Sequence, residues 1–170
     1  MDVWRRAYAL SAVAVGVAVL SACAANVETP ASLVEASASP LFADTPLPPM
    51  PQLDPDRVEA GAVIYDQYCA SCHQSDLSGD PDWKKPNTDG SLRSPPHDSS
   101  GHTWHHSDQL LLTLIRDGSG LDESPMPAYG ATLTDNEIVS VIEFFKSTWG
   151  VEERSFQWQV TWSEQQRTGE

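Results

Sequence analysis

The sequence predicts an all-α protein with about three to four core helices and a long N-terminal segment that lacks helical periodicity. Three stretches carry apolar residues at the 3–4-residue spacing of amphipathic helices, beginning near Asp54, Ser107 and Thr134. No strand–helix–strand pattern is visible between them. A five-residue motif, Cys69-Ala70-Ser71-Cys72-His73, follows directly on the first of these stretches.

Each predicted helix has recognisable start and stop signals. The first has Asp54 as N-cap and Pro55 at its first position, and its apolar positions run into the cysteine pair. The second opens at Ser107 or Asp108 and ends at Asp117-Gly118, where glycine suits a C-cap. Its expected buried residues are Leu110, Leu111, Leu114 and Ile115.

The third predicted helix begins with a capping box in which Thr134 is the N-cap and Glu137 stands three residues later. Its apolar residues at helical spacing are Ile138, Val141, Ile142, Phe145 and Trp149, with Phe144 beside them. Gly150 is expected to end it. In the tail, residues 150–170, apolar and polar residues alternate as in a strand, but the sequence shows no partner strand. We therefore expect a C-terminal helical extension that packs on the domain.

Cys69, Cys72 and His73 have the spacing of a c-type haem attachment site. One helical turn can present both thiols to the vinyl groups of one haem, and the next residue, His73, can then reach the iron. A structural zinc half-site and a thioredoxin-like redox pair are the alternatives. Zinc would need further ligands, and the remaining cysteine, Cys23, lies far upstream. The cofactor predicted is therefore one covalently bound haem c.

The first 53 residues are predicted to export and anchor the protein. Residues 1–22 have a basic start and an apolar run of signal-peptide length. They end in Leu20-Ser21-Ala22-Cys23, which resembles a bacterial lipobox and implies lipidation at Cys23. Residues 23–53 are rich in proline and alanine and are expected to form a disordered tether. The protein would then sit on the extracytoplasmic face of a bacterial membrane, either periplasmic or at the cell surface.

Two loops have features that suit a cofactor. Residues 74–101 show no helical periodicity, and so long an irregular segment is unusual in a small domain unless it packs on a cofactor. Trp83 and Leu92 are the apolar residues of this segment that could pack on a haem. Met126 lies between Pro125 and Pro127 in a later loop. A thioether on so rigid a loop is well suited to the second axial position of a haem iron, and His/Met ligation is typical of electron-transfer cytochromes c.

The stretch Gly101-His102-Thr103-Trp104-His105-His106 is unusual. With His97 nearby, the side chains of His102, His105 and His106 could form a second metal site, for example for copper. The alternative, which we favour, is that these residues cap and flank the helix that opens at Ser107.

The chain carries 10 basic and 24 acidic residues, a formal charge of −14. Such a balance argues against nucleic acid as a partner, because nucleic-acid binding needs basic patches. It suits a soluble body that docks on the basic surface of a redox partner, with charge steering the encounter. No nucleophile–base arrangement for hydrolysis stands out.

Three blocks together resemble class I, single-haem cytochromes c, and the stretch from Gly101 to His106 with the lipobox resembles the bacterial lipoprotein-anchored type of this family. They are the segment from Gly61 to His73, the segment Met126-Pro127-Ala128-Tyr129-Gly130, and the segment from Leu133 to Phe144. The resemblance implies a domain over 54–149, with His73 and Met126 as axial ligands. It also implies a helix crossing of Gly61 and Tyr65 against Phe144, and a hydrogen bond from His73 Nδ1 to the carbonyl of Pro95 or Pro96. If Pro95 is the match, His97 stands where the family usually has leucine.

The function predicted is single-electron transfer between redox partners rather than catalysis. The same residues fit a domain that works alone and a subunit of a larger oxidoreductase. One alternative is a haem enzyme or ligand sensor with an open iron face, which requires that Met126 does not bind. Another is a copper-binding accessory protein that uses the histidine-rich loop.

Overall fold

The computed structural model describes residues 46–169, and these contain five α-helices, one short 3₁₀ helix and no strand. The all-α prediction is therefore confirmed. The signal segment, Cys23 and most of the predicted tether lie outside the described residues. None of the described helices is both long enough and apolar enough to cross a membrane.

The predicted helix boundaries agree closely with the structure. Helix α1 spans Pro55–Tyr68 with Asp54 as its N-cap, and α3 spans Asp108–Asp117 between Ser107 and Gly118. Helix α4 spans Asp135–Ser147 and has the complete Thr134–Glu137 capping box. It ends before Gly150, which was expected to end it, and Gly150 is instead the N-cap of the next helix, α5 (Val151–Thr168). The 3₁₀ helix η1 (Thr103–His105) precedes α3, and the four-residue helix α2 (Ala70–His73) follows α1.

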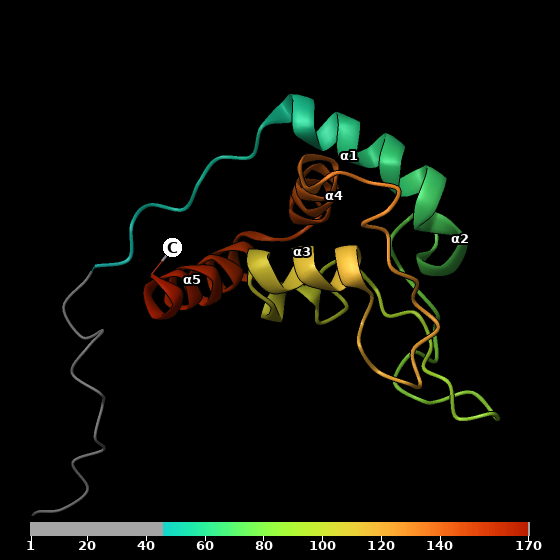
Figure 1. Cartoon of the computed structure of the whole chain (residues 1–170). Coiled ribbons are helices and arrows are strands. Elements are labelled where there is room, and N and C mark those ends of the chain that lie inside the picture. Colours follow the sequence, from blue (N-terminus) through green and yellow to red (C-terminus); the bar gives the residue numbers. More distant parts are fainter. Residues whose placement is uncertain (1–45, 170) are drawn as a thin grey trace, which may run out of the picture. The chain divides into compact units, whose positions relative to one another are not determined.

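The core forms where α1 crosses α4 and where α3 packs against α4 (Figure 1). Gly61 makes the crossing close, because a Cβ atom there would lie 2.5 Å from the carbonyl carbon of Ser140. One turn later, the ring of Tyr65 contacts Phe144 at 5.4 Å and Phe145 at 5.8 Å between centroids. The Gly61/Tyr65 crossing against Phe144 is present, and it includes Phe145 as well.

Apolar residues of α3 and α4 supply most of the core. All five α4-region residues expected at helical spacing are buried: Ile138, Val141, Ile142, Phe145 and Trp149. On α3, Leu111 and Ile115 are buried as expected, but the expectation for Leu110 was wrong, because its side chain is 40 % exposed. Leu110 stands in the first turn of α3 and does not belong to the core that includes Leu111 and Ile115.

The C-terminal tail forms helix α5 (Val151–Thr168), so the predicted helical extension is confirmed. Its buried side, carrying Gln157 and Thr161, packs on the segment around η1 and the start of α3. Gln157 Nε2 donates to the carbonyl of His106 and to Asp108, and Thr161 Oγ1 accepts from the backbone N–H of Asp108.

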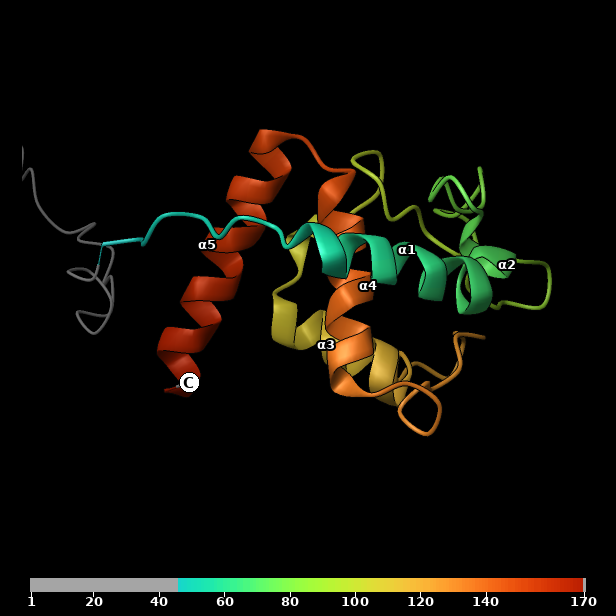
Figure 2. The ribbon, with the colours of Figure 1, turned by 90° about the horizontal axis from the view of Figure 1, so that it is seen from above.

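The last residues of the tether lie along α5 before α1 begins (Figure 2). Trp158 Nε1 donates to the carbonyl of Pro48 at 2.8 Å, and Arg154 Nη2 donates to the carbonyl of Pro51 at 3.1 Å. These carbonyls are three positions apart in the sequence, and three residues make one turn of polyproline II. Pro48 and Pro51, near the end of the predicted linker, are therefore hydrogen-bonded to α5.

Candidate haem site

The cysteine motif occupies one tight turn at the end of α1. Cys69 caps α1, and its carbonyl then accepts from the backbone N–H groups of Cys72 and His73, at 3.1 and 3.0 Å. Both thiols are free, that of Cys69 half-buried and that of Cys72 exposed. Gln74 adopts a positive φ of 65°, which turns the chain away directly after His73. Two thiols and one imidazole therefore project from a single helical turn.

The thiols do not have the electrostatics of a reactive redox pair. Burial raises the pKa of the Cys69 thiol to about 11, and the neighbouring Cys72 adds to the rise. Redox-active pairs depend on a thiolate whose pKa is lowered. The zinc half-site also lacks partners, since residues 46–169 hold no group of three or more His, Cys, Asp or Glu side chains placed to bind a metal ion. Both alternatives to haem attachment are weakened.

His73 is buried and its ring has a defined tautomer. Its Nδ1 lies 2.9 Å from the carbonyl oxygen of Pro95, which meets the expectation for one of the two candidate prolines. A carbonyl can only accept, so Nδ1 carries the hydrogen and Nε2 keeps its lone pair. No described residue bonds to Nε2. Burial lowers the pKa of His73, although the Pro95 bond opposes the shift, and the neutral imidazole is the form that binds metals.

Two glycines allow close backbone contacts with the Pro95-Pro96 pair. A Cβ atom on Gly79 would lie 2.6 Å from Pro95, and one on Gly101 would lie 2.9 Å from the carbonyl carbon of Pro96. The backbone N–H of Gly79 donates to the carbonyl of His73 at 2.9 Å, which joins the loop to the cysteine motif. The backbone N–H of His97 donates to the carbonyl of Leu77 at 2.8 Å, which joins two segments of the loop. The Pro95 carbonyl is thus held in place by its own backbone surroundings.

Met126 lies in a loop that is fixed at several points. Its side chain is half-buried and packs against the core, and its backbone N–H donates to Ser124 Oγ at 3.3 Å. Tyr129, three residues later, donates its hydroxyl to the carbonyl of Tyr68 at 2.7 Å, which ties the loop to the last residue of α1. Leu92 N–H donates to the carbonyl of Glu123, so the loop that carries Pro95 and the loop that carries Met126 are also joined to each other.

The rings of the histidine-rich stretch pack mainly on aromatic side chains in the part of the chain that the structure describes. The ring of His102 stacks on Trp83 at 5.1 Å, whereas the ring of His105 packs edge-on against Trp104 at 3.9 Å. His106 contacts only the His102 ring among these, at 5.3 Å. His102 and His106 are therefore neighbours, whereas His105 packs on Trp104, and residues 46–169 hold no group of three or more side chains placed to bind a metal ion. Trp83 likewise packs on His102, and Leu92 remains 39 % exposed.

Sequence reasoning missed the role of His97 in this region and the environment of Arg93. His97 stacks on the ring of His73, with 4.1 Å between centroids. Arg93 pairs with Asp80 at 3.2 Å through Nη1, but its buried Nε has no partner among the described residues. The only sequence signal for Arg93 and His97 was that they flank the Pro95-Pro96 pair.

The residues present fit a covalently attached haem. Two thiols on one turn suit its two vinyl groups, and the free Nε2 of His73 suits its iron. Buried polar groups are normally hydrogen-bonded, yet Arg93 Nε and His102 Nδ1 are unpartnered among residues 46–169. An unpartnered, buried guanidinium donor suits a cofactor that carries carboxylates.

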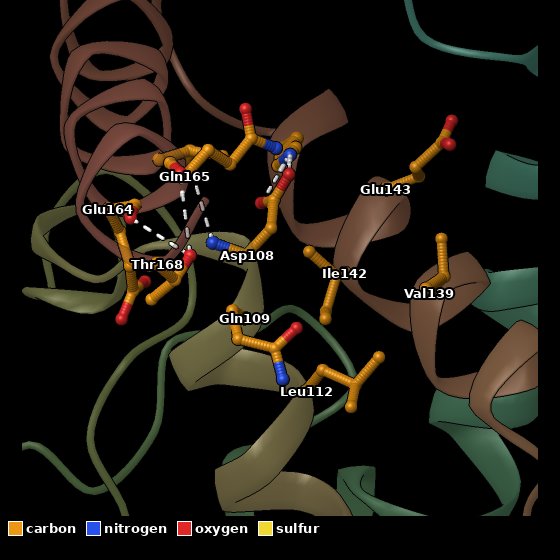
Figure 3. A pocket seen from close by; sticks show the side chains of 11 residues that line it. Asp108, Gln109, Leu112, Val139, Ile142, Glu143, Glu164, Gln165 and Thr168 are labelled. Carbon is orange, nitrogen blue, oxygen red and sulfur yellow. Dashed lines mark hydrogen bonds and ion pairs between the residues drawn. The ribbon is translucent and has the colours of Figure 1, made fainter. Parts of the chain in front are cut away.

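A separate cleft of about 220 Å³ lies between α3, α4 and α5 (Figure 3). Asp108, Ile142 and Glu164 are among its lining residues, and the ion pair between Asp108 and Lys146 closes one side at 2.6 Å. None of the predicted haem-site residues lines this cleft. It therefore belongs to the packing of α5 rather than to the haem site.

Comparison with known proteins supports this interpretation. The family model described as cytochrome c oxidase, cbb3-type, subunit III matches residues 56–145, which is more than half of the chain. The matched region begins in the first turn of α1 and ends in α4, so it includes the cysteine motif, Pro95 and Met126. No curated protein matches this chain.

Proposed function

This chain belongs to the family of cytochrome c oxidase, cbb3-type, subunit III, and as a c-type cytochrome it takes part in haem-based electron transfer. We propose that it is a membrane-tethered, extracytoplasmic carrier of single electrons. In this proposal Cys69 and Cys72 hold one haem c, His73 and Met126 are the axial ligands, and Cys23 carries the lipid anchor. When bound, haem c supplies one-electron chemistry through its iron.

The observation that carries the proposal is the hydrogen bond between His73 Nδ1 and the Pro95 carbonyl. It selects the tautomer in which Nε2 is free, and it holds one atom of the ring, Nδ1, while two free thiols lie on the same turn. Such a bond to the non-ligating nitrogen also raises the basicity of a metal-bound histidine. His73 is itself buried, and Tyr65 donates to the Gln74 carbonyl at 2.8 Å and holds the end of the turn.

Met126 is proposed as the second axial ligand because its loop is docked rather than free. The Tyr129–Tyr68 bond and the Leu92–Glu123 bond hold the loop against α1 and against the loop that carries Pro95. A ligand held in place before and after electron transfer keeps the rearrangement of the site small. This supports a carrier over the alternative of an enzyme or sensor with an open iron face.

Attachment of the haem is tested by producing the full chain in a host with a working haem c maturation system. Covalent haem survives denaturing electrophoresis and is detected by its peroxidase activity in the gel. We expect staining for the wild type and none for the Cys69→Ala/Cys72→Ala double variant. An unstained wild-type protein in a competent host would overturn the proposal.

The anchor is tested by separating membranes from soluble fractions and by labelling with a radioactive fatty acid. We expect the wild-type protein in the membrane fraction with label, and the Cys23→Ser variant without label. Recovery of the wild-type protein as an unlabelled soluble species would contradict the tether.

The partner is proposed to present a basic surface, because the chain has a net charge of −14. Attraction between opposite charges is screened by salt, with a Debye length of about 10 Å at 0.1 M. We expect the second-order rate of electron exchange with a basic redox protein to fall as salt is raised. A rate that is flat or rises with salt would count against steered docking.

A second role is favoured by the family description, which refers to a subunit of an oxidase. In that role the domain would work as part of a larger oxidoreductase rather than alone. Mild-detergent purification of the tagged full chain from its native membranes separates the two. Recovery with stoichiometric membrane partners supports the subunit, and recovery as a single haem protein supports the independent carrier.

A further inference from the structure

His97 is packed between two rings and is the only side chain recorded as stacked on His73 among the described residues. The His97 ring lies 4.1 Å from that of His73, at an interplanar angle of 27°, and 4.3 Å from that of Phe145 on α4, at 15°. Tyr65 meets it edge-on at 6.3 Å. The three stacked rings of His73, His97 and Phe145 therefore form a column that runs from the haem motif to the core.

The backbone of His97 is held on both sides. Its N–H donates to the carbonyl of Leu77 at 2.8 Å, and its carbonyl accepts from Trp149 Nε1 at 2.7 Å. Trp149 is buried at the end of α4, and Leu77 is buried in the loop after the motif. His97 is thus anchored to the core independently of the ring that it stacks on.

The side chain of His97 is oriented by Thr103. The buried hydroxyl of Thr103 donates to the carbonyl of Pro96 at 3.1 Å, and this uses its single hydrogen. The contact of 3.0 Å between Thr103 Oγ1 and His97 Nδ1 therefore has Nδ1 as the donor. His97, like His73, carries its hydrogen on Nδ1, and the bond fixes the plane of its ring.

A hydrogen bond alone does not fix the plane of His73. The Pro95 carbonyl holds one ring atom, so the ring keeps some freedom to rock about the line through Nδ1. A flat ring stacked at 4.1 Å restrains that rocking, since stacking is favourable only while the two faces stay near parallel. Leucine, which the family usually has at this position, presents no flat face.

We propose that His97 is a positioning residue which, oriented by Thr103, sets the plane of the His73 imidazole at the haem iron. This inference rests on the proposed role of His73 as axial ligand. Its chemical basis is the orientation of a metal ligand by groups outside the coordination sphere. A role in packing alone would leave the plane of His73 unchanged when Thr103 loses its hydroxyl.

The test uses the electron paramagnetic resonance spectrum of the oxidised, haem-loaded full chain. For a low-spin ferric haem, the g values depend on the orientation of the axial imidazole plane, and the width of the signal depends on how narrowly that plane is distributed. Thr103→Val keeps the shape of the side chain and removes its hydroxyl, whereas Thr103→Ser keeps the hydroxyl and is the matched control.

We expect Thr103→Val to shift and broaden the largest g value and Thr103→Ser to leave it as in the wild type. His97→Leu should broaden it further, while His97→Phe, which keeps two flat faces, should restore part of the sharpness. If Thr103→Val and His97→Leu lose stability but keep the wild-type signal, His97 is only a packing residue. A wild-type protein without any low-spin signal would overturn the proposed ligation, and this inference with it, before the variants are compared.

Discussion

Gly61 on α1 lies directly against the Ser140 peptide on α4, so close that a Cβ atom at Gly61 would be 2.5 Å from the Ser140 carbonyl carbon and 3.0 Å from the Val141 nitrogen. These are backbone atoms, which cannot move aside as a flexible side chain would. The contact sets how closely α1 approaches α4, and so it positions the cysteine motif at the end of α1 relative to the core.

Gly61→Ala is therefore expected to destabilise the protein, although alanine favours a helix by up to about 1 kcal/mol over glycine. Overpacking a close contact costs about 1–3 kcal/mol, and here the helices have to separate to relieve it. Urea unfolding measures the change in free energy. Ala60→Ser, at an exposed position of the same helix, is the control and should stay within about 0.5 kcal/mol. Equal effects of the two changes would contradict a close crossing.

Met126→Leu is expected to remove the sulfur ligand while keeping the volume of the side chain. Since His/Met ligation raises the reduction potential, the potential should fall and the weak far-red absorption of a methionine-ligated ferric haem should vanish. Met50→Leu is the control, because Met50 is a half-buried methionine in the segment that lies along α5. Retention of the far-red band in Met126→Leu would exclude Met126 as the ligand.

Trp158→Phe is expected to loosen the segment from 46 to 53. It keeps an aromatic ring but removes the indole N–H that donates to the Pro48 carbonyl at 2.8 Å. A typical hydrogen bond contributes about 0.5–1.5 kcal/mol, so the free energy of unfolding should fall by that amount. Trp162→Phe alters the neighbouring ring, 6.1 Å away, and serves as the control. The prediction fails if Trp162→Phe costs as much as Trp158→Phe.

His102 is expected to make stability depend on pH. Burial, followed by the charges of His106 and His105, lowers its pKa in the folded protein, whereas in the unfolded chain the pKa is about 6.5. The unfolded state therefore binds a proton first, and the stability present above pH 6.5 is lost as pH falls below that value.

His102→Phe keeps the stack on Trp83 and cannot titrate. Chemical denaturation at pH 7.5 and 5.5 should show a smaller loss of stability in the variant than in the wild type. Identical losses in the two proteins would show that His102 does not contribute to the pH dependence.

Local sequence signals were sufficient for most of the fold. Asp54, Ser107 and Thr134 are N-caps as their residue types predict, because a side-chain oxygen beside a free backbone N–H is a local interaction. A glycine within a helix indicated a close approach at Gly61, and the family resemblance indicated that Phe144 lies opposite. Leu110 was assigned wrongly, since helical spacing does not decide which edge of an apolar face the neighbouring helix covers.

The candidate site was only partly predictable. The motif and the proline pair could be identified because their chemistry is encoded in a few adjacent residues. The choice of Pro95 over Pro96, and the stack of His97 between His73 and Phe145, depend on contacts between residues 22 to 48 positions apart. The packing of His102 on Trp83 and of His105 near Phe156 also depends on residues that no local pattern connects to them.

The measurement that tests the central claim most directly is the visible and near-infrared absorption spectrum of the full chain, matured in a host that attaches haem and recorded oxidised and reduced. Ligation by His73 and Met126 predicts a low-spin c-type spectrum with the weak far-red band of a sulfur-ligated ferric iron. A low-spin spectrum without that band would contradict Met126 as ligand. A high-spin spectrum would contradict the carrier and leave an iron with an open face.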